Sequence, residues 1–575
     1  MKSIKKALSI MSAVLLSGMC VLSNMSFASA ETSDMEFGLP EAPDVNSQEY
    51  QEYLDHYSNG GIPDVPGAGD VTFGSSCDLS KTKYFPAIGN QSLGSCTSWS
   101  TTYYQFTYEA NKLNNISSNS SSNIYSPVYT FSFIGPVFNY QAYDFLKIHG
   151  AVKISEMPLS SSYTKWCTNT DAMVNALNTR VKKDYANRVY TNHASENLDY
   201  IKSLLYGTNG TDGKIISVNT TDFEGWEYEP IKNPVTVYTE YAAVRSTRTY
   251  DDNEGGDAHA LTVVGYNDNI WCDLNGNNKK DNGEVGAFKV ANSYGTGYKN
   301  SGYVWVMYDA LNSQSMVSGW EDTSKTRKPI FEHYSNNYNE FYWIDVENKE
   351  VEYVGQLTLN TNNCSSFMLY AGKNTTSVTP SNFNTIFDFD NTKASNYTGT
   401  LVFDYADLAN PIEDNLTGYR WFVKVVGIHN SRSFKITDNL SKTIVNFNSI
   451  SNGTHSKSIN LSKGDLNYDN SIDSLDVEML SEYNIETIPF SNVQKCLGDF
   501  NNDGIISNAD ISALSKYLLF NGNLSTYELR KISEINQKNL DYMIANNYSS
   551  AEIQEIRSLN FEIKAQLGGN YNETK

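Results

Sequence analysis

Hydrophobic positions follow different spacings along the chain, and each spacing predicts a different kind of element. Between about residues 84 and 307, helix-like spacings come first and apolar strands follow, which is typical of one α+β domain. From about 331 to 447, Asn, Ser and Gly turns separate seven runs rich in Val, Ile, Tyr, Phe and Thr: FYWIDV, QLTL, SFMLYA, TLVFDY, RWFVKVV, SFKIT and TIVNF. Such runs predict a β-sandwich.

The last part of the chain contains an internal repeat. Segments that begin at Gly464 and Gly498 match each other at a spacing of 34 residues, and a polar helical tail follows them. A chain of this length is too long for one core. We expect a signal peptide (1–30), a leader or linker (31–80), an α+β domain (81–325), a β-sandwich (328–450), the repeated unit (463–522) and the tail (525–575).

The first thirty residues have the pattern of a secretory signal. Lys2, Lys5 and Lys6 precede the apolar stretch AVLLSGMCVL, and Ala28-Ser29-Ala30 ends the segment with small residues. Neither this stretch nor any later one is apolar over the length that a bilayer requires. The sequence therefore predicts a secreted, extracellular protein without a membrane span.

The charge balance argues against polyanionic partners. The chain carries 65 acidic and 43 basic residues, for a formal net charge of −22. Such a surface repels nucleic acid and anionic membrane. The acidic residues gather in Asp- and Asn-rich runs, which suit hard cations such as calcium.

Cysteines are few and scattered. Six remain after the predicted signal peptide, which is too sparse for a disulfide framework, and the sequence gives no pairing: Cys77, Cys96, Cys167, Cys272, Cys364 and Cys496.

One of these cysteines lies at a predicted helix start. After Cys96, apolar residues follow at Trp99, Tyr103, Phe106, Ala110 and Leu113, a spacing that predicts one buried helix face with Ser95 as its cap. In the first turn, the helix dipole and free amides favour the thiolate, which is the reactive form of cysteine. A lone cysteine at a helix start is nevertheless more often inert.

Two further residues complete a nucleophilic constellation. His259 begins the apolar strand HALTVVGY, and Asn292 ends the next strand, in AFKVANSYG. A thiolate needs a group that holds its proton, and that group needs a partner that orients it. Each residue alone is explained equally well as a polar group at a strand end, but the three together favour catalysis.

These residues resemble the papain family of cysteine peptidases over about 84–307. QSLGSC resembles its oxyanion-hole Gln and nucleophile, SPVYTF the helix region that follows, HALTVVGY its histidine strand, and NSYGTGYKNSGYVWV its Asn-Ser-Trp-Gly segment. The resemblance implies a helical lobe packed on a β-rich lobe, and a catalytic triad of Cys96, His259 and Asn292. It also implies acyl transfer without a catalytic cofactor, with the oxyanion bound by the Cys96 N–H and the Gln91 side chain.

The sequence departs from that family in three places. The interval from Gln91 to Cys96 is one residue shorter than usual, so Asn90 is the alternative oxyanion donor. Tyr294 stands where the family has a tryptophan beside the catalytic asparagine. The region before residue 84 is shorter than a typical inhibitory propeptide, which makes control by a propeptide doubtful.

An insertion between His259 and Asn292 has the composition of a calcium loop. In DLNGNNKKDNGE, counted from Asp273, oxygen-bearing side chains fall at EF-hand positions 1, 3, 5, 9 and 12. We expect calcium ligands at Asp273, Asn275, Asn277, Asp281 and Glu284, although the same composition also suits a solvated loop.

The repeated segments carry two more such loops. The first, DLNYDNSIDSLD, offers Asp465, Asn467, Asp469, Ser471, Asp473 and Asp476, and the second, DFNNDGIISNAD, offers Asp499, Asn501, Asp503, Ile505, Ser507 and Asp510. A helix follows each loop. The duplicated unit resembles a type I dockerin over about 463–521, and the alternative is a free calcium buffer. The resemblance implies structural calcium and, as partner, a cohesin module of a scaffold protein, contacted through loop positions 10 and 11 (Ser474, Leu475, Asn508 and Ala509) and the helix face.

Together these patterns predict a secreted cysteine endopeptidase that a calcium-dependent dockerin holds in a cellulosome-like complex. A catalytically silent papain-fold subunit that binds protein or carbohydrate is the alternative. A third possibility is an adhesin whose sandwich stacks sugars on Tyr342, Trp343, Tyr419 and Trp421, although strand aromatics are more often core residues.

Overall fold

The structure is a computed structural model of the chain. It describes residues 73–568 except 248–257, 321–326, 333–337, 352, 375–383, 389–391, 406–419, 428–429, 439–442, 459–461, 486–487, 491 and 523. The predicted signal peptide and most of the predicted leader lie outside the described residues. None of the helices in the described part of the chain combines the length and the hydropathy that a membrane span needs.

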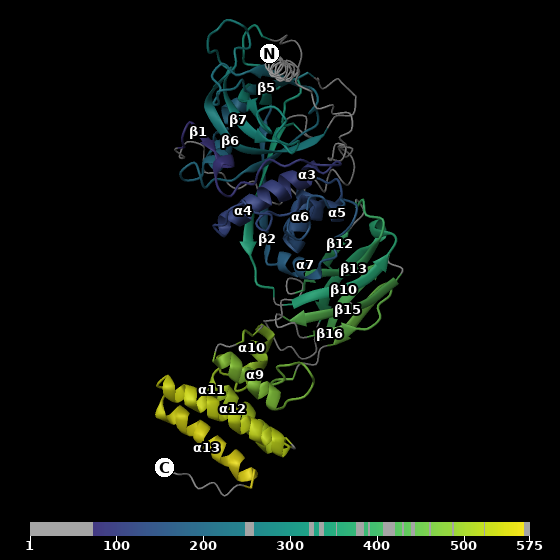
Figure 1. Cartoon of the computed structure of the whole chain (residues 1–575), viewed down its shortest axis with the longest axis vertical. Helices are drawn as coiled ribbons and strands as arrows, with labels where there is room; N and C mark the ends of the chain where they lie inside the picture. Colours follow the sequence, from purple (N-terminus) through teal and green to yellow (C-terminus); the bar gives the residue numbers. More distant parts are fainter. Residues whose placement is uncertain are drawn as a thin grey trace, which may run out of the picture.

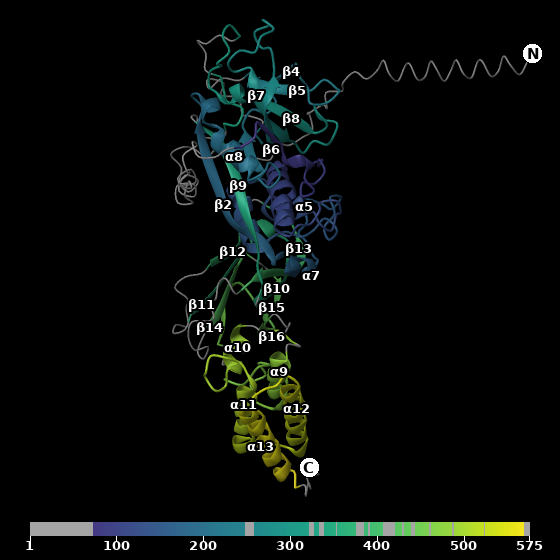
Figure 2. The ribbon, with the colours of Figure 1, turned by 90° about the vertical axis from the view of Figure 1, so that its left-hand side faces the viewer.

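Three units follow one another along the long axis of the molecule, as Figures 1 and 2 show from two directions. A mixed unit of helices and a large sheet lies at one end, a pair of smaller sheets lies in the middle, and a helical unit that ends near the C-terminus lies at the other end.

The helices of the first unit come mainly from its first half. Cys96 to Leu113 is one continuous helix, composed of α3, a π-helical stretch (η3) and α4. We expected one buried face on this helix, but nearly all of it is buried because helices pack on one side and the large sheet on the other, while Leu113 is exposed. The helices are α3 Cys96–Ser98, η3 Trp99–Phe106, α4 Thr107–Leu113, α5 Pro127–Ile134, α6 Asn139–His149, α7 Thr170–Ala176 and α8 Asp199–Tyr206, with shorter η2 Leu79–Lys81, η4 Ala194–Asn197 and η5 Tyr308–Leu311.

The sheet of the first unit has nine strands in the order β2-β9-β3-β6-β7-β8-β5-β4, with β1 paired to β6. The central strand β6 is buried over its first eight residues, which explains its unbroken apolar sequence. Because β1 belongs to this sheet, the first unit begins before residue 81, where we expected a linker. The strands are β1 Ser76–Asp78, β2 Thr179–Tyr190, β3 Ile216–Thr220, β4 Trp226–Pro230, β5 Tyr241–Ser246, β6 His259–Trp271, β7 Val285–Ala291, β8 Tyr303–Met307 and β9 Tyr338–Asn348.

Strand β9 corrects the domain boundary. It contains the run FYWIDV, which we expected to begin the sandwich, but it pairs along its whole length with β2 and over two residues with β3. The pattern of a half-buried strand does not say which sheet the strand joins. The large sheet therefore extends to Asn348, and only four residues separate β9 from the first sandwich strand.

The middle unit is a sandwich of two four-stranded sheets, β13-β10-β15-β16 and β12-β11-β14-β17. Tyr353 of β10 and Trp421 of β14 meet between the sheets, with ring centroids 5.7 Å apart. Its strands are β10 Tyr353–Thr361, β11 Met368–Asn374, β12 Asn384–Asp388, β13 Tyr397–Asp404, β14 Arg420–Val426, β15 Asn430–Asp438, β16 Thr443–Phe447 and β17 Gly453–Ser458.

Buried polar contacts join the first unit to the sandwich. Arg180 of β2 donates to Asp404 of β13 across 2.6 Å, and both side chains are almost fully buried. The indole of Trp166 donates to Thr392, whose hydroxyl donates to the carbonyl of Ser132. Lys349, just after β9, also lies 3.8 Å from the Asp404 carboxylate, so this acid of the sandwich is paired with two bases of the first unit.

The last unit is helical. The two loop-helix repeats supply α9 and α11, which pack on each other, and the tail forms the antiparallel pair α12 and α13 (Figure 1). The helices are α9 Ser474–Asn484, α10 Asn492–Gly498, α11 Asn508–Asn521, α12 Thr526–Ala545 and α13 Ser550–Gln566.

Candidate active site and calcium loops

The structure places Cys96 and His259 at the starts of two elements that pack on each other, α3 and β6. Cys96 is the first residue of α3 and belongs to a small buried cluster with Phe138, Ala258 and Ala260. Cys96 and His259 are both fully buried.

Ser95 does not cap this helix. Its hydroxyl donates instead to the carbonyl of Ser92 at 2.7 Å, and no side chain caps the helix start. The expected cap is therefore wrong. The first amides of α3 are left without a side-chain acceptor, at the place where a developing oxyanion would need donors.

Asn292 fixes the tautomer of the imidazole. Its Oδ1 lies 2.8 Å from His259 Nε2 and also accepts the backbone N–H of Ser293 at 2.7 Å. Because a backbone N–H can only donate, this atom of Asn292 is the oxygen, and His259 Nε2 must carry a proton. The other ring nitrogen, Nδ1, is then unprotonated and free to accept the proton of a thiol.

Aromatic rings enclose the imidazole. The rings of Phe223 and Tyr294 lie 4.6 and 4.8 Å from that of His259, so Tyr294 provides the aromatic neighbour predicted from the sequence. The Tyr294 hydroxyl lies 3.5 Å from His259 Nδ1, too far for a strong hydrogen bond. Burial lowers the pKa of His259 to about 4, against the raising effect of the Asn292 contact, so the ring is neutral at neutral pH.

Gln91 lies beside the asparagine segment, and Asn90 faces solvent. The Gln91 backbone N–H donates to the carbonyl of Ser293 at 2.7 Å, and the Ser293 hydroxyl donates to Gln91 Oε1 at 2.5 Å. The amide nitrogen makes only a 3.3 Å contact with the carbonyl of Leu93, which leaves it available to a stronger acceptor. The contact between Ser293 and Gln91 was not predicted from the sequence, although Ser293 belongs to the motif NSYG.

The other cysteines differ from Cys96. None of the six cysteines in the described part of the chain forms a disulfide; Cys77, Cys167, Cys272 and Cys364 are buried, and Cys496 is exposed. Burial raises the pKa of Cys77, Cys272 and Cys364 to about 12, so these thiols stay protonated and inert.

The three candidate calcium loops share one backbone design. In each, position 12 is a carboxylate that accepts backbone N–H groups from positions 3 and 9 of its own loop: Glu284, Asp476 and Asp510. Position 6 has a positive φ in all three, at Asn278, Asn470 and Gly504. Position 4 is also left-handed in all three loops, at Gly276, Tyr468 and Asn502, so the glycine of the inserted loop stands where the other two loops have the same backbone conformation.

The carboxylates of the repeated loops fit a cation. Oxygens of Asp499, Asp503 and Asp510 lie within 4.8 Å of one another, with the neighbouring amide oxygen of Asn501 turned to the backbone of Asp503. In the first loop, burial and the nearby Asp465 carboxylate raise the pKa of Asp476 to about 6. A divalent cation would relieve this crowding of acids.

In the inserted loop 273–284, other protein groups already contact the carboxylates. Its Asp281 carboxylate accepts the side-chain amides of Asn275 and Asn277, and Lys232 lies 3.4 Å from Asp273. Glu284 is fully buried, and its carboxylate is held by the backbone of the loop. The lysine supplies part of the positive charge that a metal would provide.

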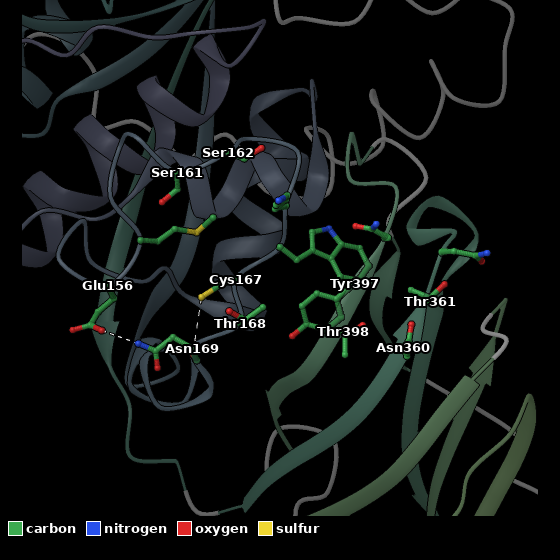
Figure 3. Close-up of a pocket in the computed structure, with 15 residues that line it drawn as sticks. Glu156, Ser161, Ser162, Cys167, Thr168, Asn169, Asn360, Thr361, Tyr397 and Thr398 are labelled. Carbon is green, nitrogen blue, oxygen red and sulfur yellow. Dashed lines mark hydrogen bonds between the residues drawn. The ribbon is translucent and has the colours of Figure 1, made fainter.

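A crevice of 760 Å³ lies apart from these sites, where the first unit meets the sandwich (Figure 3). Amides, hydroxyls and two aromatic rings line it, and Asn169 donates to Glu156 at its edge. None of the predicted catalytic residues takes part in its lining, and no sequence pattern indicated it. It is lined by Glu156, Met157, Ser161, Ser162, Lys165, Trp166, Cys167, Thr168, Asn169, Asn360, Thr361, Asn362, Asn396, Tyr397 and Thr398.

Residues 463–519 match the family model for the dockerin type I domain. No curated protein matches the chain in sequence. The predicted type I dockerin is thereby confirmed, and dockerins are modules that bind calcium and cohesins.

Solved structures similar to the first part of the chain are papain-like cysteine proteases. Xylellain, a cysteine protease from Xylella fastidiosa, is 14% identical with a TM-score of 0.34 and covers 54% of this chain and 97% of its own. Procathepsin B S9 from Trypanosoma congolense is 14% identical with a TM-score of 0.33 and covers 56% and 90%. The bromelain protease from Ananas comosus is 13% identical with a TM-score of 0.30 and covers 47% and 99%.

The predicted multidomain architecture is confirmed: an α+β unit, a β-sandwich and a small helical dockerin. The similarity to these proteases, at 13–14% identity and TM-scores below 0.5, carries no conclusion about the site. The assignment of catalytic residues therefore rests on the contacts of Cys96, His259 and Asn292 in this chain.

Proposed function

We propose that the chain is a secreted cysteine endopeptidase that its dockerin holds in a cellulosome-like, extracellular complex. The observation that carries the peptidase proposal is the fixed tautomer of His259: its Nε2 proton points to Asn292, and its unprotonated Nδ1 is left to accept the proton of Cys96, which begins the helix that packs on β6. The dockerin carries the proposal of a cohesin partner.

The geometry supports acyl transfer. His259 Nδ1 accepts the thiol proton of Cys96 as the sulfur attacks a peptide carbonyl, and the oxyanion is bound by the Cys96 backbone N–H and the Gln91 side chain. The imidazolium then gives its proton to the leaving amine, which departs and leaves a thioester. Water, deprotonated by His259, hydrolyses the thioester and restores the thiol.

The adhesin alternative loses support among the described residues. Tyr342, Trp343 and Trp421 are 1%, 3% and 4% exposed, so their ring faces belong to the core and offer no stacking surface. Tyr419 lies outside the described residues. A silent papain-fold subunit remains the second candidate, and the full burial of Cys96 and His259 is the observation that favours it.

A peptide epoxide that alkylates activated thiols separates these two candidates. We expect it to label Cys96, identified by peptide mapping, because Cys96 begins the helix that packs on β6, the strand headed by the neutral imidazole of His259. A Cys496→Ser variant serves as the background, since Cys496 is the exposed thiol that a reagent reaches without activation. Labelling that spares Cys96 would favour the silent subunit.

The pH dependence of the labelling rate reports on His259. Because burial lowers its pKa to about 4, His259 can accept the thiol proton down to that pH and loses this capacity below it. We expect the acid limb of the rate to lie near pH 4, well below the ordinary histidine value of about 6.5. An acid limb between pH 6 and 7 would show that the ring is solvated in the reactive state.

The oxyanion donor is tested by paired substitutions. Gln91→Ala should lower turnover by about 10²- to 10³-fold, the usual cost of one such donor. Asn90→Ala should have a much smaller effect, because Asn90 is exposed while Gln91 is tied to Ser293. Steady-state kinetics on one peptide substrate compare the two. A larger loss for Asn90→Ala would move the oxyanion hole by one residue.

We propose calcium as the ion of the two dockerin loops and of the inserted loop 273–284. The inserted loop immediately precedes β7, which leads to Asn292, so an ion there would stabilise the strand that positions the triad. Chelation should lower the melting temperature of the full chain in two steps, one of which disappears in Asp273→Ala and Glu284→Ala. Calorimetry distinguishes the steps. If both variants keep the full calcium response of the wild type, the inserted loop binds no calcium.

A further inference from the structure

The C-terminal helices cover one face of the dockerin. We call α12 and α13 the C-terminal hairpin; α12 packs on α9, and α13 packs on α11 (Figures 1 and 2). Polar contacts accompany the packing: Lys531 lies 2.7 Å from Glu478, the Ser481 hydroxyl donates to Asn539 at 3.1 Å, and Lys516 pairs with Glu555 at 2.8 Å.

The covered positions are equivalent in the two repeats. The 34-residue spacing relates Glu478 and Ser481 of α9 to Ser512 and Ser515 of α11. Glu478 and Ser481 contact α12, while Asn508 and Ser512 line a small cavity together with residues of the hairpin: Met543, Tyr548, Glu552, Glu555 and Ile556. The hairpin therefore lies across both repeats, on the face formed by the two helices that follow the loops.

The contact between hairpin and dockerin is unusually poor in hydrogen bonds. Among the described residues, eight buried side-chain atoms of this region have no hydrogen-bond partner: the Ser512 and Ser515 hydroxyls, Asn508 Nδ2, Asn539 Nδ2, and both amide atoms of Asn536 and Asn560. Buried polar groups in a permanent core are nearly always paired, and an unpaired one costs about 1–3 kcal/mol. These unpaired groups make the free energy of the contact between hairpin and dockerin less favourable than its apolar contacts alone would suggest. The same polar groups can form hydrogen bonds when water or another protein replaces the hairpin.

The hairpin also lies against the predicted recognition residues of the second repeat, since Asn508 and Ala509 line the small cavity that it shares with the dockerin. At loop position 10, Ser474 and Asn508 are buried, whereas at position 11 Leu475 and Ala509 are exposed. The predicted recognition surface thus has an exposed edge, at which a partner could begin to bind, beside residues that are buried.

We propose that the C-terminal hairpin occupies in cis the face of α9 and α11 to which a cohesin binds, and that cohesin binding displaces it. The proposal rests on the proposed dockerin function. When the binding-competent state is a fraction of the total, the apparent dissociation constant rises by the inverse of that fraction. The hairpin then weakens anchoring until a cohesin replaces it, and the unpaired hydroxyls and amides of α11 become available to the partner.

Two changes with opposite expected effects test the displacement. A chain that ends at residue 524 lacks the hairpin and should bind immobilised type I cohesin modules, in calcium, at least about tenfold more tightly than the full chain. Asn536→Leu with Asn560→Leu, in the full chain, should weaken cohesin binding, because apolar side chains of similar shape remove the unpaired amides and strengthen the closed state. Lys538→Leu on the exposed side of α12 is the matched control and should leave affinity unchanged.

Hydrogen exchange of the full chain without cohesin gives a second readout. Amides of α12 and α13 should exchange faster than those of α9 and α11, and the double leucine variant should slow them. Unchanged or weaker binding after truncation, together with unchanged affinity in the leucine variant, would overturn the proposal. If none of the immobilised cohesin modules binds any variant, the proposed dockerin function is wrong. In that case hydrogen exchange still tests the hairpin: if α12 and α13 exchange only together with α9 and α11, the hairpin is not displaceable.

Discussion

Cys96→Ala should abolish hydrolysis of peptide substrates, with a loss of kcat on the order of 10⁴-fold or more, because it removes the proposed nucleophile. The fold should survive, since replacing the buried Cys96 thiol by hydrogen removes one heavy atom and opens only a small cavity. Hydrolysis of a fluorogenic peptide and thermal unfolding measure the two effects.

A second buried cysteine supplies the control. Cys77 lies on β1 in the same unit, and its thiol is protonated because burial raises its pKa to about 12. Cys77→Ala should therefore change stability slightly and leave hydrolysis intact. Full activity in Cys96→Ala would refute the peptidase proposal, whatever the fold.

The paired change Asp465→Ala and Asp499→Ala should abolish capture by a cohesin and spare hydrolysis. These residues occupy position 1 of the two dockerin loops, where each accepts backbone amides that close the loop. Calcium binding, loop closure and the start of the following helix are linked, so loss of the ligand should lose the surface of α9 and α11.

Calorimetry on the wild type and the double variant, with and without EDTA, checks this expectation. Asp541→Ala, an exposed acid of α12 outside both loops, controls for the loss of charge. Cohesin binding that persists undiminished in excess EDTA would contradict calcium-dependent docking.

The sequence predicted best what is encoded locally. Each dockerin loop is twelve consecutive residues, so its ligands and its left-handed positions can be read from spacing and confirmed by the backbone, as at Asn470 and Gly504. The same holds for His259 and Asn292: each lies at one end of an apolar strand, and the two strands pair as neighbours.

One error came from a competing local contact, and the others came from contacts between distant parts of the chain. Ser95 looks like a helix cap, but the preceding turn offers its hydroxyl the carbonyl of Ser92 instead. The run FYWIDV is a strand, yet its sheet is decided by pairing with β2, more than 140 residues earlier in the chain. Neither the packing of the hairpin on α9 and α11 nor the polar crevice beside the sandwich has a sequence pattern of its own.

The continuous path from β9 into the sandwich determines how the enzyme is presented to its surroundings. A flexible linker would let the catalytic unit explore a sphere around its anchor, and the local substrate concentration would be averaged over that volume. Here four residues and the buried Arg180–Asp404 pair make the sandwich a rigid spacer, at least from the large sheet as far as β13. Whether the catalytic unit reaches a substrate on the same scaffold then depends on the orientation of the substrate as well as on its distance. Lengthening the β9–β10 connection would therefore broaden the set of accessible cleavage sites.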